Sequence, residues 1–252
     1  MHLSRRFHFY GKRRIESVIL FFRFIGHVFY SLKEIFLRRL TLSWSHLLDT
    51  VFHSGAKIAI PLILLSSLIG ISLVLNIFHI LSRYNLQHNV LIIAQYVLFY
   101  DLLPFLIGLM LSVQSALNLI TARIKEHQKT PQDVIVVHII PIMIGTNFNG
   151  LILYAYALNT VLISIYFCFR YFFSFDLHEY IFHLTNTISG TAILYSILKT
   201  FVYCTMVSLI VGYYYYEATE GYLSLKQAIS RIMTRSFMVL IVSSIYFKFL
   251  DY

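Results

Sequence analysis

Two ionisable side chains lie within apolar stretches of the chain, where they could carry or pair a charge. Asp101 is the only charged residue between Val90 and Ile120. Lys199 lies about eight residues, or roughly 12 Å along a helix, inside another apolar segment. Ionisable groups at membrane depth are costly and usually pair or line a wet cavity. We predict that Asp101 and Lys199 border one cavity with a polar floor. The alternative is that Lys199 extends to the lipid headgroups and Asp101 caps a broken helix.

The sequence lacks the motifs of common catalytic and metal sites. It contains no G-x-x-x-x-G-K-[ST], H-E-x-x-H or G-x-S-x-G, so we predict neither a P-loop nor these hydrolase sites on this chain. The segment DLHEYIFH, residues 176–183, holds two histidines, but they are five apart and do not share a helical face. A solvated loop is the favoured interpretation there, and no metal site and no catalytic residue are expected.

The composition indicates an integral membrane protein. Hydrophobic residues make up 58% of the 252 residues and charged residues only 12%, whereas soluble domains carry about 25% charged residues. The formal net charge of +9 does not indicate a nucleic-acid partner, because the basic residues collect in gaps between apolar segments rather than on a polar face.

Five apolar segments approach the length of about 20 residues that a membrane span needs. We predict spans over residues 58–80, 104–121, 151–169, 191–212 and 236–250. The run 90–120 would reach roughly 46 Å as one helix, and Pro104 removes a backbone donor. We therefore expect a break near residues 101–104, with 90–100 as a shorter piece near the interface.

The predicted fold is an all-α integral membrane protein with an N-terminal interfacial helix and five transmembrane helices. Residues 15–37 mix apolar with basic side chains, which is typical of a helix that lies in the interface. A basic N-terminal region, residues 1–56, would precede a five-span transmembrane domain, residues 57–252. The basic N-terminus lacks a small-residue cleavage site, so no signal peptide is expected.

The distribution of basic residues predicts the orientation. Lys and Arg number ten in residues 1–57, three in 122–133 and three in 217–235, all on one predicted side. By the positive-inside rule the N-terminus is cytoplasmic and the C-terminus lies outside.

Four stretches resemble motifs of the MlaE (YrbE) family, the permease subunits of MCE-associated ABC transporters. QAISRIMTRSF, residues 227–237, is similar to the family's G-[IV]-S-R-A-T-T-R, and ILKTFVY places Lys199 on the lysine of L-I-K-S-V-V-F. LIGISLVLN resembles F-I-G-M-V-L-G-L-Q, with Asn76 for the glutamine. LFYDLLPFL resembles R-E-L-G-P, with Tyr100 for arginine, Asp101 for glutamate and Pro104 retained.

The resemblance implies a homodimeric subunit in a bacterial inner membrane that works with a cytoplasmic ABC ATPase and a periplasmic MCE-domain protein. It would move phospholipids between the inner membrane and the cell envelope. The chain itself would need no cofactor, because ATP would be used by the ATPase. A lipid carrier needs an apolar cavity with cations near the headgroup, and the predicted lipid-binding residues are Leu73, Asn76, Ile77, Tyr100, Asp101, Pro104, Lys199 and Arg235.

The chain departs from the family pattern where the ATPase would dock. The family's A-E-I-G becomes ARIK, residues 122–125, and the cytoplasmic segment that follows is shorter by a couple of helical turns. The predicted ATPase-contact residues are Arg123, Lys125, Glu126 and Lys129, and a solvated loop is the alternative for them.

Two other classes of function stay open at this stage. One is a proton-coupled secondary transporter or an intramembrane enzyme that uses Asp101, although the inverted repeats common in secondary transporters are not evident. The other is a scaffold subunit that translocates nothing, which the shortened loop would favour.

Overall fold

The computed structural model describes residues 19–35, 37, 44–86, 89–123, 135–173, 176–187 and 190–250, and these are helical apart from short turns. A helix over residues 19–35 comes first. The later elements are α2 (Trp44–Ser82), α3 (Val90–Gln95), the π-helix η2 (Tyr96–Leu102), α4 (Leu103–Arg123), the π-helix η3 (Ile135–Ile139), α6 (Ile140–Phe173), α7 (Leu177–Thr187), α8 (Gly190–Thr219) and α9 (Leu225–Leu250).

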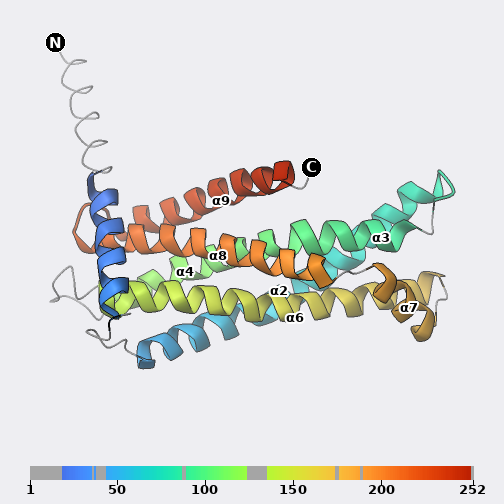
Figure 1. Cartoon of the computed structure of the whole chain (residues 1–252), viewed down its shortest axis with the longest axis horizontal. Helices are drawn as coiled ribbons and strands as arrows, with labels where there is room; N and C mark the ends of the chain where they lie inside the picture. The colour runs from blue at the N-terminus through green and yellow to red at the C-terminus, as the bar shows by residue number, and fades with distance from the viewer. Residues whose placement is uncertain are drawn as a thin grey trace, which may run out of the picture.

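Five helices are long and apolar enough to cross a membrane, which confirms the predicted fold class. The spans run over Lys57–Ser82, Val90–Asn118, Ile140–Phe172, Gly190–Thr219 and Leu225–Leu250. They lie roughly side by side in one elongated bundle (Figure 1), in which α2 packs along α6, and α8 contacts α4, α6 and α9. α2 begins at Trp44, before the predicted domain boundary at residue 57.

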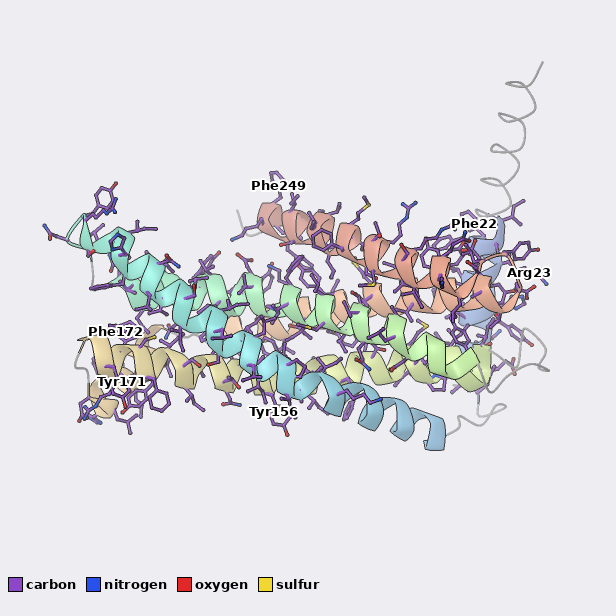
Figure 2. All side chains as sticks on the ribbon, turned by 180° about the vertical axis from the view of Figure 1, so that it is seen from behind. Phe22, Arg23, Tyr156, Tyr171, Phe172 and Phe249 are labelled. Atoms are coloured by element: carbon purple, nitrogen blue, oxygen red, sulfur yellow. The ribbon has the colours of Figure 1, made fainter. Side chains whose placement is uncertain are left out.

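The outer surface of the bundle is apolar, as a lipid-facing surface requires. Large aromatic side chains such as Tyr156, Phe172 and Phe249 are exposed, and they project from the outside of α6 and α9 (Figure 2). Because there is no water beside a membrane span, these exposed side chains contribute to membrane insertion rather than to a core.

The helix over residues 19–35 lies across one end of the bundle, roughly at right angles to the spans (Figure 1). Phe24 is buried, and its ring lies 5.9 Å from Tyr213 and 5.8 Å from Tyr216, measured between centroids. The tyrosine run at the end of α8, residues 213–216, is therefore buried beneath this helix. The aromatic contacts fix the N-terminal helix to the end of α8.

The predicted helix break at residues 101–104 is wrong. The chain continues from α3 through η2 into α4, so residues 90–100 belong to the second span. A seven-residue π-helix takes the place of the break, because a widened turn adapts the backbone to Pro104 without ending the helix. Two other spans begin earlier than predicted, with the third at Ile140 and the fifth at Leu225.

The predicted loop over residues 176–183 is also wrong, because α7 (Leu177–Thr187) forms there. Tyr180 anchors this helix, and its hydroxyl donates a hydrogen bond to the carbonyl of Leu162 on α6 at 3.0 Å. Burial raises the pKa of Tyr180 above its ordinary value. Within the described ranges there is no group of three His, Cys, Asp or Glu residues that could hold a metal ion.

Candidate functional site

A carboxylate bound by two lysines lies within the bundle. The Nζ atom of Lys199 on α8 is 2.8 Å from Oδ1 of Asp101, and the Nζ atom of Lys248 on α9 is 2.5 Å from Oδ2. The side chain of Lys199 is 0% exposed, that of Asp101 20% and that of Lys248 45%. We call these three residues the ion cluster. It joins η2, α8 and α9 through one carboxylate.

The π-helix η2 places Asp101 in this cluster. In η2 the N–H of Leu103 donates to the carbonyl of Leu98, a π-type bond, and Pro104 has no N–H to donate to the next carbonyl, that of Phe99. The hydroxyl of Ser196 on α8 donates to that carbonyl at 2.5 Å. Because a buried backbone carbonyl needs a partner, Ser196 replaces the donor that proline removed. Lys199 lies one helical turn further along α8, beside Asp101.

Replacing Ser196 with alanine is expected to destabilise the folded protein by about 1–3 kcal/mol, because the buried carbonyl of Phe99 would lose its donor. The matched control is Ser208→Ala on the same helix, since the hydroxyl of Ser208 donates only to Thr205 within α8; its expected cost is below about 1 kcal/mol. Thermal unfolding of the detergent-solubilised proteins measures both. Equal losses in the two variants would contradict the role of Ser196.

Aromatic rings lie over both lysines of the ion cluster. The Nζ atom of Lys199 is 5.5 Å from the centroid of Phe247, and that of Lys248 is 5.2 Å from the centroid of Tyr96. Tyr96 in turn contacts Tyr100, with the ring centroids 5.1 Å apart. An aromatic face stabilises an ammonium group, more so where water is scarce. The cluster is thus surrounded by groups that favour cations at membrane depth.

The structure brings only part of the predicted lipid-binding set together. Asp101 and Lys199 form an ion pair, Tyr100 is partly buried one position away, and Pro104 is buried at the start of α4. Leu73 and Ile77 on α2 are partly buried against the apolar cluster that includes Leu98 and Phe99.

Asn76 and Arg235 lie apart from the ion cluster. The amide of Asn76 is exposed and donates to the carbonyl of Ser72 within its own helix. Arg235 precedes Lys248 by 13 residues on α9, or about 20 Å of helix. The predicted lipid-binding set therefore contains two cations, Lys199 and Arg235, that lie at different heights along the bundle.

Sequence reasoning missed Lys248 and Ser196. Lys248 is the only charge in the last predicted span, residues 236–250. That position within an otherwise apolar helix end was the one available signal. Of the predicted ATPase contacts, Arg123 ends α4, and Lys125, Glu126 and Lys129 lie outside the described residues.

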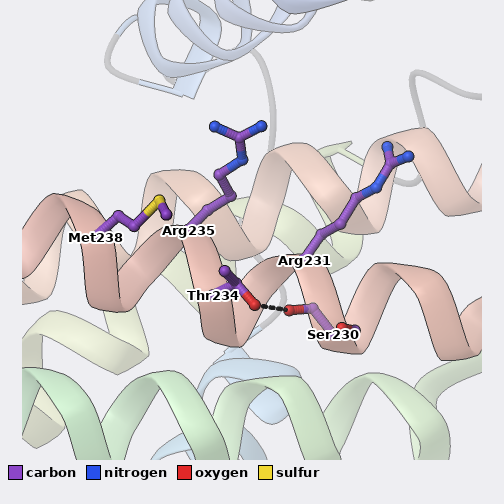
Figure 3. Close-up of a pocket in the computed structure, with 5 residues that line it drawn as sticks. All are labelled: Ser230, Arg231, Thr234, Arg235 and Met238. Carbon is purple, nitrogen blue, oxygen red and sulfur yellow. Dashed lines mark hydrogen bonds between the residues drawn. The ribbon is translucent and has the colours of Figure 1, made fainter.

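A second polar feature lies in the first half of α9. A pocket of ≈ 300 Å³ is lined by Ser230, Arg231, Thr234, Arg235 and Met238. Arg231 and Arg235 extend from the same side of the helix (Figure 3). The hydroxyl of Thr234 donates to the carbonyl of Ser230 at 2.9 Å. We call this feature the arginine pocket.

The comparisons with known proteins give one family. The family model described as permease MlaE matches residues 47–250, which is most of the chain and includes all five spans. No curated protein matches the chain. The family suggests a membrane permease subunit of a lipid-transport system rather than an enzyme. With five spans and a buried ion cluster inside the matched region, this chain belongs to the MlaE permease family.

Proposed function

We propose that the chain moves phospholipids between a bacterial inner membrane and the cell envelope, as the permease subunit of an ABC transporter. The observation that carries this proposal is the ion cluster, in which two ammonium groups are held within an apolar bundle. A phospholipid combines a phosphate with apolar chains, so its carrier requires cations beside apolar surface. Lys199 and Lys248 supply those cations, and Lys248, whose side chain is half-exposed, is the one that we expect a headgroup to reach.

The remaining predicted site residues fit the same proposal in different roles. Tyr100 and Pro104 shape the wall beside Asp101, and Leu73 and Ile77 contribute apolar surface from α2. Asn76, on the exposed side of α2, would meet lipid rather than the ion cluster. Arg235 belongs to the arginine pocket.

We further propose a homodimer with its N-terminus in the cytoplasm, a cytoplasmic ABC ATPase and a periplasmic MCE-domain protein as partners, and no cofactor on this chain. The distribution of Lys and Arg supports the orientation. The ATPase would push on the segment after α4, through Arg123, Lys125, Glu126 and Lys129. ATP would be hydrolysed on the ATPase chain alone.

Purification of the chain with its native partners tests this function. We expect glycerophospholipid by mass spectrometry, an ATPase in the complex, and ATP-dependent transfer of labelled phospholipid between donor and acceptor vesicles. Proton-coupled uptake by the isolated chain, abolished by Asp101→Asn, would support a secondary transporter instead. Partners without bound lipid or lipid-stimulated ATP hydrolysis would indicate a scaffold.

A further inference from the structure

The ion cluster contains a binding site for a primary ammonium group, which Lys248 occupies. The Nζ atom of Lys248 lies 2.5 Å from Oδ2 of Asp101 and 5.2 Å from the centroid of the Tyr96 ring. The ring of Tyr100 lies against that of Tyr96, with the centroids 5.1 Å apart. A carboxylate beside an aromatic face is a combination that suits an ammonium ligand, because both attract the positive charge.

The two lysines of the ion cluster differ in how readily their ammonium groups would leave the carboxylate. The side chain of Lys199 is 0% exposed, and its ammonium bonds to Oδ1 at 2.8 Å, so its release would leave a buried charge without a counterion. The side chain of Lys248 is 45% exposed and lies two residues before Leu250, where α9 ends. A lysine in that position can extend its ammonium toward water. The ammonium at Oδ2 is therefore exchangeable, whereas the one at Oδ1 is fixed.

The exchangeable position is open to the outside of the bundle. Tyr96 is exposed, and the side chain of Asp101 is partly exposed. On α9, Ile241 and Ile245 precede Lys248 by seven and three residues, which places them on the same face of the helix, and both are exposed. A ligand whose ammonium is bound to Asp101 would therefore find apolar surface beside it for hydrocarbon chains.

Phosphatidylethanolamine has the chemistry that matches this site. Its headgroup ends in a primary ammonium, the same group that lysine carries, and a short ethyl linker joins that ammonium to the phosphate. With the lipid ammonium at Oδ2 of Asp101, the phosphate would lie close by, within reach of the long side chain of the displaced Lys248. Both charges of the zwitterionic headgroup would then meet opposite charges of the protein.

Net charge alone would favour a different lipid. Two lysines and one carboxylate leave the ion cluster with one net positive charge, which an anionic lipid would neutralise. Half of the Lys248 side chain is exposed, however, and pairing of an exposed charge contributes little. The contacts at Asp101 therefore decide the preference. A headgroup without an ammonium would draw Lys248 away from Asp101 and put nothing in its place.

We propose that the ion cluster selects phosphatidylethanolamine by exchange: the lipid ammonium replaces that of Lys248 between Asp101 and Tyr96, and Lys248 then binds the lipid phosphate. The inference rests on the proposed function and adds the headgroup class to it. Tyr96 is the residue that determines specificity without holding the buried ion pair, because its ring lies over Lys248, whereas the ring over Lys199 is that of Phe247.

Lipid binding by the full chain in detergent micelles tests the exchange. The probes are phosphatidylethanolamine and phosphatidylglycerol with the same fluorescent acyl chain. We expect the wild type to bind phosphatidylethanolamine about tenfold more tightly, as one charge-assisted hydrogen bond allows. Tyr96→Leu should reduce this preference about threefold, because the aromatic face is lost, and Tyr96→Phe should retain it. Tyr246→Leu is the matched control, since Tyr246 is an exposed tyrosine near Lys248 whose ring contacts Phe247; it should behave as the wild type does.

Lys248→Met distinguishes exchange from simple attraction of a phosphate. Without Lys248 both lipids lose the cation that binds the phosphate, but phosphatidylethanolamine meets an ammonium position for which no lysine competes. The preference for phosphatidylethanolamine should therefore rise above that of the wild type. An equal loss of affinity for both lipids would overturn the exchange, because Lys248 would then act only as a phosphate ligand.

Two further results would overturn the proposal while leaving the proposed function intact. One is wild-type binding of phosphatidylglycerol as tight as that of phosphatidylethanolamine or tighter, which would make net charge the determinant. The other is an unchanged preference in Tyr96→Leu. Absence of binding of both lipids to the wild type would instead contradict the proposed function itself.

Discussion

Replacing Asp101 with alanine is expected to destabilise the folded protein by about 3–5 kcal/mol, the typical cost of leaving a buried charge without its partner. The reason is the burial of Lys199, whose side chain is 0% exposed and whose ammonium lies 2.8 Å from the Asp101 carboxylate. Without that carboxylate, the chain must either keep an uncompensated ammonium in the bundle or deform to solvate it. Unfolding of the protein in micelles measures the loss.

The two lysines provide the controls for this experiment. Lys199→Met combined with Asp101→Ala should recover most of the stability, because an apolar replacement of a whole buried pair is often neutral or favourable. Lys248→Met alone should cost less than about 1 kcal/mol, since the Lys248 side chain is 45% exposed. A double-mutant cycle that gives no coupling free energy between residues 101 and 199 would show that the ion pair does not stabilise the fold.

For phospholipid transfer we expect the ranking of the two lysines to be reversed: Lys248, which matters less for stability, matters more for transfer. Lys248→Met should reduce phospholipid transfer while leaving the protein folded, because the accessible cation of the ion cluster is lost. Lys248→Arg should retain transfer, since a guanidinium keeps the positive charge and also binds phosphate oxygens. The role of Lys248 in headgroup binding would be refuted by unchanged transfer in Lys248→Met.

Replacing Gly150 with alanine is expected to destabilise the protein by about 1–3 kcal/mol through overpacking. A Cβ atom at Gly150 on α6 would lie far inside contact distance of Sγ of Cys204 on α8. Cys204 is fully buried, so its thiol has little room to move. The helices must separate or shift, and this loss exceeds the roughly 1 kcal/mol that alanine gains over glycine in a helix.

A second substitution distinguishes a steric effect from other causes. Cys204→Ala removes the sulfur that the new methyl group would meet, so Gly150→Ala should be tolerated better in that background. Gly70→Ala is the matched control in another buried helix contact, because its Cβ would meet Val161 at an ordinary 3.6 Å. Thermal unfolding compares the four variants, Gly150→Ala, Cys204→Ala, their combination and Gly70→Ala, with the wild type. A steric origin would be excluded by an equal loss at Gly150 with and without Cys204.

The apolar pattern of the sequence determined the five spans and the all-α class, because a membrane span is specified by local composition and length. The motif around Asp101 and Lys199 likewise indicated the family before any packing was known. The sequence misled at Pro104, where a missing backbone donor favoured a break. The structure keeps the helix intact because Ser196, distant in sequence, donates to the carbonyl of Phe99.

Only the tertiary structure decided which charges meet. Lys248 reaches Asp101 because α9 crosses beside η2, while Arg235 on the same helix lies about 20 Å away. These partners depend on the rotation and tilt of α8 and α9 and on the widened turn of η2, which sequence spacing does not specify. The composition of a segment determines whether it enters the membrane, because the free energy of insertion is a sum over the residues of the segment. The pairing of buried charges depends on ångström-scale packing between helices, so it is decided when the bundle assembles.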